Sequence, residues 1–380
     1  MNLDFSEDHY VLRDQLRRFL AERCPSSLVR AVAAGEKSHD RGLYRKLAEL
    51  GVLGAAIPER YGGAAAGQLE LCILAQELGR VLAPVPACST IYLAANFLLL
   101  AGDEHQKRRL LPAFVTGEKV CAVALSEAPG HVTPATVNAV ARSGMISGTK
   151  IPVPDGDGAD VAIVLACDRN AGIRDAHSLF LVDLSAPGVS RERVDTIDIT
   201  HGYARLSFEN APAEPLGAAG EAWQLIERAF NRAAVLIAFE QVGGAERTIE
   251  LSRDFALERM AFGRPIGSFQ ALKHMMANMY VEATLARSNA YYGAWALSTE
   301  ADELPVAAAT ALLSASRAFL ECAKSNIQIH GGMGFTWESD CHLFYRRANA
   351  LRLILGPPSG WQDRLIGGMR ERATVAEGAA

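Results

Sequence analysis

The sequence predicts an α+β protein built from three consecutive parts, a helical domain, a β domain and a second helical domain. Apolar residues recur at helical spacing in the first and last thirds of the chain, whereas the middle consists of short β-rich runs separated by Gly, Pro, Asp and Asn. The length of 380 residues is enough for about two or three domains. We expect their boundaries near residues 1–118, 119–218 and 219–380.

The first domain is expected to be helical throughout. Leu12, Leu16 and Leu20 follow one another at four-residue intervals, which places them on one face of a helix. Stretches rich in Pro and Gly, at 58–63 and 83–86, interrupt this pattern. Such residues stop helices or fix turns, so we expect several helices joined by short loops.

The middle domain is expected to be a β-barrel or β-sandwich. Four runs carry the β signal because they are short, rich in apolar residues and bounded by turn-forming residues, at 120–125, 160–166, 177–183 and 205–210. After residue 220 the helical period returns in four long segments, at 221–260, 267–298, 305–329 and 338–355. Many alanines in the third segment would let neighbouring helices approach closely, so a four-helix bundle is expected.

Composition excludes several classes of protein. Apolar residues make up 49% of the chain and charged residues 21%, as in ordinary globular proteins. The net charge is −5 with Lys and Arg scattered, so we expect no nucleic-acid partner. No apolar run approaches the roughly 20 residues that span a bilayer, and the acidic first residues do not resemble a signal peptide. A cytoplasmic protein without a membrane partner is therefore expected.

The cysteines do not predict a metal site. Seven cysteines are present, and none of them forms a Cys-x-x-Cys pair. An odd number of thiols in a chain without a recognisable leader is typical of reduced, mostly buried cysteines. We expect no bound metal.

Two stretches in the last third combine residues that could hold a nucleotide. Residues 258–270 contain Arg259, Phe262 and Gln270, and residues 328–334 read Gln-Ile-His-Gly-Gly-Met-Gly. Taken alone, the second stretch is more typical of a glycine that ends a helix. The functional alternative is that glycines without side chains let the backbone approach a ligand while an amide side chain binds it.

The order of these stretches, behind an α, then β, then α layout, resembles the acyl-CoA dehydrogenase family. The resemblance covers nearly the whole chain. Further matching positions in the first domain are Leu43, Lys46, Leu47 and Gly51, then Pro58, Tyr61, Gly62 and Gly63, then Glu77 to Arg80, then Gln106, Lys107, Leu110 to Pro112, Gly117 and Glu118. The resemblance implies an N-terminal helical domain, a middle β domain and a C-terminal four-helix bundle.

The same resemblance implies a flavoprotein enzyme. Members of the family are FAD-dependent oxidoreductases that convert acyl-CoA thioesters to their α,β-unsaturated products and pass electrons to an electron-transfer flavoprotein or a similar acceptor. They assemble as dimers of dimers, with FAD between subunits. A homo-tetramer or a hetero-tetramer is therefore expected here.

The residues implied to contact FAD fall into two groups. One group would bind the pyrophosphate and adenosine of a neighbouring subunit's FAD, and it comprises Arg259, Phe262, Gln270, Gln328, Gly331 and Gly332. The other group, Leu125, Ser126 and Glu127, matches the segment that contacts the isoalloxazine ring. Pro152 and Pro154 stand where many relatives have a Trp and a Thr beside the ring, so the second group departs more from the family pattern.

The usual catalytic base is missing. In the family a glutamate removes the α-proton while the flavin accepts the β-hydride, and the matching residue here is Leu355. Some relatives carry this glutamate on the first bundle helix, where the present chain has Ala233. Glu240 lies seven residues further on and nearly on the same helix face, about 10 Å along the axis. It is the candidate base, and its alternative role is a buried ion pair.

Three functions remain open at this point. The first is dehydrogenation of an acyl-CoA with a bulky or unusual acyl group, as in similar bacterial members that act on steroid acyl-CoAs, with Glu240 as base. The second is a catalytically silent subunit of a heteromeric dehydrogenase, which completes the FAD site of an active partner. The third is a flavin monooxygenase or oxidase on the same fold, which needs no carboxylate.

Overall fold

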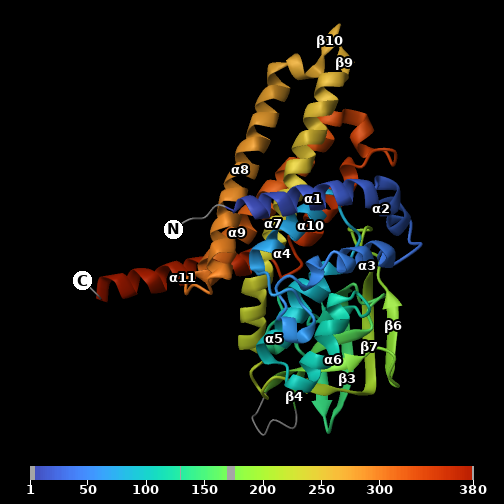
Figure 1. Ribbon diagram of the computed structural model, residues 1–380, viewed down its shortest axis with the longest axis vertical. Coiled ribbons are helices and arrows are strands. Elements are labelled where there is room, and N and C mark those ends of the chain that lie inside the picture. The colour runs from blue at the N-terminus through green and yellow to red at the C-terminus, as the bar shows by residue number, and fades with distance from the viewer. Residues whose placement is uncertain (1–4, 129, 169–175, 379–380) are drawn as a thin grey trace. The chain divides into compact units, whose positions relative to one another are not determined.

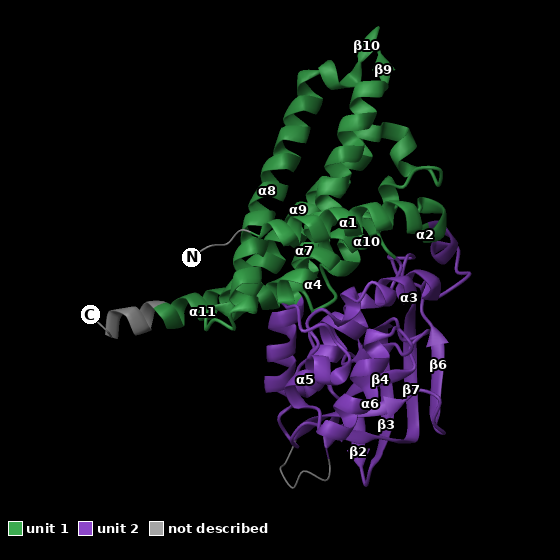
Figure 2. Cartoon of the chain, viewed as in Figure 1, with its two compact units in different colours: residues 1–29, 68–83, 234–380 green, residues 30–67, 84–233 purple. Residues whose placement is uncertain are grey.

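The computed structural model describes residues 5–128, 130–168 and 176–378, with the side chains of 373–378 excepted, in two compact units (Figures 1 and 2). Residues 1–4, from which we expected no signal peptide, lie outside the described residues. The helical unit, as we call it, comprises residues 1–29, 68–83 and 234–380, and the sheet unit comprises residues 30–67 and 84–233. Each unit takes segments from more than one of the expected domains, so the domain boundaries stay a prediction.

The helical unit contains long helices that match the expected segments of the C-terminal bundle. Its helices are α1 (Glu7–Arg23), α4 (Gln68–Arg80), most of α7 (Ala222–Glu258), α8 (Gln270–Ser298), α9 (Leu304–His330), α10 (Cys341–Leu351) and α11 (Pro358–Gly378). Figure 1 shows α7 and α8 as a long pair, joined at the tip by the two-stranded hairpin of β9 (Met260–Ala261) and β10 (Arg264–Pro265). The predicted helical bundle is confirmed.

Helix α9 is the most apolar of these helices. With the short η6 turn (Gly331–Phe335) it is the one helix among the described residues that is long and apolar enough to cross a membrane. However, 67% of its most apolar window is buried inside the structure. Its buried face includes Leu312, Phe319 and Ala323. The burial is that of a core helix.

Helices α4 and α7 touch backbone to backbone. A Cβ atom at Gly79 on α4 would lie 1.9 Å from the carbonyl oxygen of Glu240 on α7. One turn further along, a Cβ atom at Gly243 on α7 would lie 1.9 Å from the carbonyl oxygen of Gln76 on α4. Only glycine leaves room for such a close crossing, so these two positions fix how the two helices pack.

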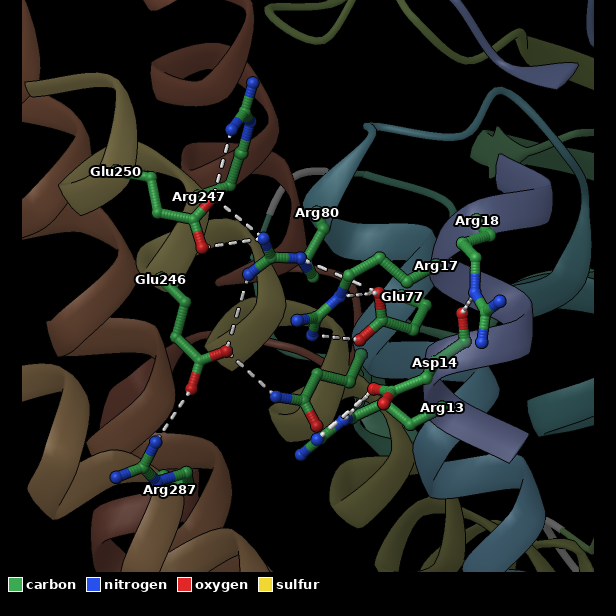
Figure 3. Close-up of polar contacts among 11 residues, drawn as sticks. Arg13, Asp14, Arg17, Arg18, Glu77, Arg80, Glu246, Arg247, Glu250 and Arg287 are labelled. Carbon is green, nitrogen blue, oxygen red and sulfur yellow. Dashed lines mark hydrogen bonds and ion pairs between the residues drawn. The ribbon is translucent and has the colours of Figure 1, made fainter. Parts of the chain in front are cut away.

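A network of charged side chains joins α4 to α7 beside this crossing (Figure 3). Arg80 is buried, and its Nη2 donates to both carboxylate oxygens of Glu250 at 2.7 and 2.8 Å. The same guanidinium lies 3.7 Å from Glu246 and 3.6 Å from Glu77. Burial alone would raise the pKa of Glu250, but its hydrogen bond to Arg80 and the charge of that side chain hold the pKa below its ordinary value.

The network extends to two more helices. Arg17 on α1 donates to the carboxylate oxygens of Glu77 at 2.7 and 3.0 Å, and this hydrogen bond raises the pKa of Arg17. Arg287 on α8 lies 3.3 Å from Glu246 (Figure 3). Four helices therefore meet around one set of alternating charges, and each buried carboxylate has a cationic partner.

The sheet unit is built around one eight-stranded sheet. Along its main path the strands follow the order β6 (Val189–Arg193), β7 (Tyr203–Pro212), β3 (Met145–Pro154), β2 (Val140–Arg142), β4 (Val161–Asp168), β5 (His177–Asp183) and β8 (Glu214–Leu216). Strand β1 (Cys121–Ala124) pairs in parallel with β4, with Cys121 opposite Val161. The α+β class and the middle β domain are confirmed.

Short helices complete the sheet unit. They include α3 (Arg41–Glu49), α5 (Ala95–Ala101) and α6 (Glu104–Val115), while α2 (Ser26–Ala33) crosses the boundary of the two units in the chain. The core of the sheet lies at β4 and β5, because every residue of β4 and all but the last of β5 are buried. Strand β6 is mostly exposed and lies at one end of the strand order.

A buried histidine in the sheet unit makes stability depend on pH. Neither ring nitrogen of His39 has a hydrogen-bond partner among the described residues, and burial lowers its pKa from the ordinary 6.5 even though Asp155 lies near. The unfolded chain therefore binds the proton more readily than the folded chain does. The free energy of unfolding has its full value above about pH 6.5 and falls as the pH drops below that value. The total loss is about 1.4 kcal/mol for each unit by which the pKa of His39 in the folded chain lies below that in the unfolded chain.

We expect chemical denaturation to give a lower free energy of unfolding at pH 5 than at pH 7, and the His39→Leu variant to lose most of this difference. His274→Gln, at an exposed position, is the matched control and should keep the wild-type dependence. The pKa of Asp155 is held below its ordinary value by His201 and Ser89 against the effect of burial, so its own contribution is lost only below about pH 4. Equal slopes for wild type and His39→Leu would contradict the assignment.

Candidate functional site

The helical unit places Arg259 at the end of α7, where the chain turns into the β9–β10 hairpin. The carbonyl oxygen of Arg259 accepts a hydrogen bond from the N–H of Ile266 at 2.8 Å, which closes the base of the hairpin. Its side chain is exposed and forms no ion pair with any described residue. A planar guanidinium that is not already paired can bind two phosphate oxygens at once. The residue fits the predicted pyrophosphate contact.

Phe262 lies at the tip of the hairpin in a strained conformation. Its backbone φ is +51°, in the left-handed region, and its side chain is 94% exposed. A bulky residue is uncommon there, and the conformation costs about 1 kcal/mol or more. The ring of Phe262 packs edge-to-face with Phe269, with ring centroids 6.1 Å apart. Strain and exposure together favour a contact with a ligand or another subunit.

The end of α9 approaches the same region. The ring of His330 stacks on Phe255, one turn before Arg259 on α7, with ring centroids 4.2 Å apart. Gln328 is exposed, and Cβ atoms at Gly331 and Gly332 would meet nothing within 4 Å. Gly331 ends the helix with φ +57°. An open glycine backbone beside an exposed amide fits the predicted adenosine contact.

Gln270 begins α8 after the hairpin and the short η5 helix (Ile266–Ser268), and its side chain is exposed. Each of the six residues predicted for the neighbouring subunit's FAD is therefore exposed on the helical unit. The stack of His330 on Phe255 brings the end of α9 beside the end of α7.

The sheet unit carries the segment predicted for the flavin ring, directly after β1. The backbone N–H groups of Leu125, Ser126 and Glu127 donate to no other described residue. The Ser126 hydroxyl donates to the carbonyl oxygen of Ala128 at 2.7 Å. The carboxylate of Glu127 accepts from the buried Lys150, with its Nζ 2.7 Å away. Three unpaired backbone donors in a row fit the acceptor atoms of an isoalloxazine edge.

The environment of Glu240 differs from that of an accessible base. Its side chain is buried, and its Oε1 accepts a hydrogen bond from Nη1 of Arg347 on α10 at 3.2 Å. Arg347 is itself only 1% exposed. The backbone of Glu240 is the surface on which Gly79 packs. The pair satisfies two buried charges at the crossing of α4, α7 and α10.

The two positions that carry the base in relatives lack a carboxylate. Leu355 is buried, and its carbonyl oxygen accepts a hydrogen bond from the indole of Trp361 at 3.2 Å. Ala233 on α7 is also buried. Sequence reasoning missed two residues at these sites, Arg347 and Lys150, because each lies far along the chain from the carboxylate that it binds. Among the described residues no group of His, Cys, Asp and Glu could hold a metal ion.

Models of two protein-family domains match the chain. The model described as "Acyl-CoA dehydrogenase, N-terminal domain" matches residues 6–118. The model described as "Acyl-CoA dehydrogenase, C-terminal domain" matches residues 220–362. Together they cover well over half of the chain.

Individual proteins agree with the family models. Acyl-CoA dehydrogenase IpdE2 of Mycobacterium tuberculosis is 33% identical over 93% of this chain and 94% of its own length. The solved structure of the Tcur3481-Tcur3483 steroid ACAD variant is 31% identical with a TM-score of 0.85, covering 97% of this chain and 99% of that one. The ChsE4-ChsE5 complex from Mycobacterium tuberculosis is 26% identical with a TM-score of 0.87, covering 98% and 99%.

Proposed function

The chain belongs to the acyl-CoA dehydrogenase family, and from this premise we propose that it is a subunit of a mixed assembly in which a partner chain removes the α-proton of the substrate. It is a member of a family of FAD-dependent oxidoreductases that dehydrogenate acyl-CoA thioesters. When bound, FAD would accept a hydride at its ring. The residues of this chain would hold parts of the cofactor and help to assemble the site.

The single observation that carries the proposal is the pairing of Glu240 with Arg347. A base must offer its carboxylate to the substrate, whereas Oε1 of Glu240 is hydrogen-bonded inside the protein to a guanidinium that is also buried. Leu355 and Ala233 supply no alternative. The positions that serve a neighbouring subunit's FAD are in contrast exposed and available. The chain is therefore better equipped to complete a partner's site than to deprotonate a substrate itself.

We assign the exposed residues of the helical unit to that task. Arg259 would bind the pyrophosphate of the partner's FAD, and Phe262 and Gln270 would contact the nucleotide beside it. Gln328 would bind the adenosine with its amide, while Gly331 and Gly332 would let the backbone approach. These roles rest on the matching of residues to the family and on the exposure of each side chain.

The names of similar proteins support both the mixed assembly and a bulky substrate. One similar structure is called a steroid ACAD and combines two named proteins, and another is a complex of two named chains. We propose that the present chain likewise serves a ring-bearing or otherwise bulky acyl-CoA. Electrons would pass to an electron-transfer flavoprotein or a similar acceptor, as the family resemblance implies.

Glu240 as the base is the second candidate function. The observation in its favour is that a carboxylate lies within a helix whose neighbouring residues 233–239 are all buried and uncharged. Such a group is either structurally paired or functional. In this version the isolated chain would carry FAD and accept a hydride without help from another protein.

The absorbance spectrum of the purified protein tests the proposal. The chain alone should be nearly colourless, and co-expression with a dehydrogenase from a neighbouring gene should give a yellow complex whose flavin is reduced on adding an acyl-CoA. In that complex the double variant Glu240→Leu with Arg347→Met, which removes both charges of the buried pair, should leave the rate of flavin reduction unchanged. An isolated chain that holds stoichiometric FAD and is reduced by an acyl-CoA would overturn the proposal, and a loss of reduction in a stably folded double variant would favour the second candidate.

The flavin contacts are tested in the same complex. Arg259→Met removes a charge-assisted contact to phosphate, worth about 1.5–3 kcal/mol, so FAD should dissociate about 10-fold to 100-fold faster. Arg253→Met is the matched control because Arg253 is also an exposed arginine near the end of α7, 2.7 Å from its neighbour Asp254. It should keep the wild-type dissociation rate, measured by flavin fluorescence. Equal rates for both variants would contradict the assignment.

A further inference from the structure

Lys150 is the most deeply buried charged side chain of the sheet unit. It lies on β3, its side chain is 0% exposed, and its Nζ donates to the carboxylate of Glu127 at 2.7 Å and to the carbonyl oxygen of Leu125 at 3.2 Å. Burying an ammonium group is costly unless a charge and hydrogen bonds compensate it. An apolar residue at this position would avoid the cost of burying a charge, so a specific role of the lysine is expected.

Glu127 is held on every side. Its Oε1 accepts from Lys150 and from the N–H of Ala139 at 2.9 Å, and its Oε2 accepts from the N–H of Asn138 at 2.8 Å. These bonds lower the pKa of Glu127, Lys150 foremost, against the effect of burial, and burial lowers the pKa of Lys150 against the pull of Glu127. The lone pairs of the Glu127 carboxylate are directed at the protein, which leaves the side chain little capacity to bind a ligand.

The bonds around this pair fix one side of a short segment and leave the other side available. The carbonyl oxygen of Leu125 accepts from Lys150, and that of Ser126 accepts from the N–H of Ile151 at 2.9 Å. The N–H groups of Leu125, Ser126 and Glu127 donate to no other described residue. A peptide segment whose carbonyl groups are tied to β3 has little freedom to turn its N–H groups inward.

We propose that Lys150 is a positioning residue, which acts with Glu127 to hold the backbone N–H groups of Leu125–Glu127 in place for the acceptor edge of a flavin ring. The inference rests on the proposed function, because its ligand is a flavin ring bound within the mixed assembly. It adds that this chain keeps an organised ring-binding segment although it lacks the base. Glu127 then acts as the anchor of this segment through its carboxylate, and only its N–H faces the ligand.

Preorganised donors explain why an expensive buried charge is retained. Donors that are already oriented bind an acceptor without paying the conformational entropy of ordering the loop. The departures at Pro152 and Pro154 remove side chains that could contact the ring, which leaves the backbone donors as the main polar contacts of this segment. The orientation of the segment then decides how tightly this chain holds the ring.

The decisive variant removes both charges together. Lys150→Met alone leaves Glu127 buried without its cation and can unfold the sheet unit. The double variant Glu127→Gln with Lys150→Met leaves no unpaired charge and keeps a side-chain oxygen that can accept from the N–H groups of Asn138 and Ala139, so its melting temperature should stay close to that of the wild type. If the pair positions the segment, the flavin bound at this chain should nonetheless dissociate at least about fivefold faster, the effect of about one lost hydrogen bond.

The experiment uses the co-expressed complex and measures three quantities, the FAD content per complex, the FAD dissociation rate and the melting temperature. Glu192→Gln with Arg205→Met is the matched control, since this pair, 3.5 Å apart, joins β6 and β7 through exposed side chains. The control should change neither the FAD content nor the dissociation rate.

The outcomes separate this inference from the proposed function. Faster FAD release or a lower FAD content at an unchanged melting temperature supports the positioning role. If the double variant has the same FAD content and the same FAD release rate as the wild-type complex, the positioning role is overturned and the proposed function is left intact. The inference would also be overturned if the FAD release rate changed together with the melting temperature across further variants, because the role of Lys150 would then be structural only. A wild-type complex without FAD overturns both.

Discussion

An Arg347→Met substitution is expected to lower the free energy of unfolding by about 3–5 kcal/mol, because it removes the guanidinium that donates to the buried carboxylate of Glu240. Arg347 is 1% exposed and Glu240 5%, so water cannot replace the lost partner without opening the helical unit. Denaturation in guanidinium chloride measures the change. The loss should be larger than that of most single substitutions, which cost about 0.5–3 kcal/mol.

The double variant Glu240→Leu with Arg347→Met should recover most of this loss. Replacing a buried ion pair by apolar residues of similar volume is often neutral or stabilising, whereas removal of one partner is costly. Arg317→Met is the matched control, because the exposed pair of Arg317 with Glu282, 2.9 Å apart, should contribute no more than about 1 kcal/mol. A double variant as unstable as Arg347→Met would mean that Glu240 and Arg347 do not act as one pair.

The pair of Glu240 and Arg347 also bears on whether Glu240 replaces the catalytic glutamate that relatives carry at the position of Leu355. If Glu240→Leu with Arg347→Met is stable and the mixed complex still reduces its flavin with an acyl-CoA, neither residue takes the α-proton. The pair would then have a structural role at the helix crossing, although the sequence suggested Glu240 as a possible base. A stable double variant without flavin reduction would restore Glu240 as the catalytic candidate.

Much of the fold was predictable because burial leaves a periodic trace in the sequence. The runs at 160–166 and 177–183 correspond to β4 and β5, in which every residue but the last of β5 is buried. Strand β6 was not predicted, because it reads Val-Ser-Arg-Glu-Arg and is almost fully exposed at the end of the strand order. Strand β3 was also missed, since Gly148 and Pro152 interrupt its pattern and its pairing with β7 contains register shifts.

The candidate site was predictable only where short local patterns carry it. Arg259, Phe262 and Gln270 lie within twelve residues of one another, and all of them are exposed. The partners of the buried charges could not be found in this way. Arg347 lies 107 residues from Glu240 in the chain, and Lys150 lies 23 residues from Glu127. Such pairs depend on how distant segments pack, which no local period records.

Gly79→Ala is expected to destabilise the helical unit by about 3 kcal/mol, and Gly243→Ala by a similar amount. In each variant the new methyl group would lie 1.9 Å from a carbonyl oxygen of the facing helix, so α4 and α7 would have to separate. Overpacking of this kind typically costs about 1–3 kcal/mol, and here the obstacle is backbone that cannot rotate away. Separation would also disturb the contact of Arg80 with Glu250.

Gly367→Ala is the matched control, because Gly367 lies in α11 and a Cβ atom there would meet nothing within 4 Å. The intrinsic preference of helices for alanine should make this variant neutral or more stable by up to about 1 kcal/mol. The same preference acts at Gly79 and Gly243, so the difference from the control isolates the cost of the helix contact. If all three variants gained stability, α4 and α7 would not cross backbone to backbone. The packing of Gly79 against the backbone of Glu240 would then be contradicted.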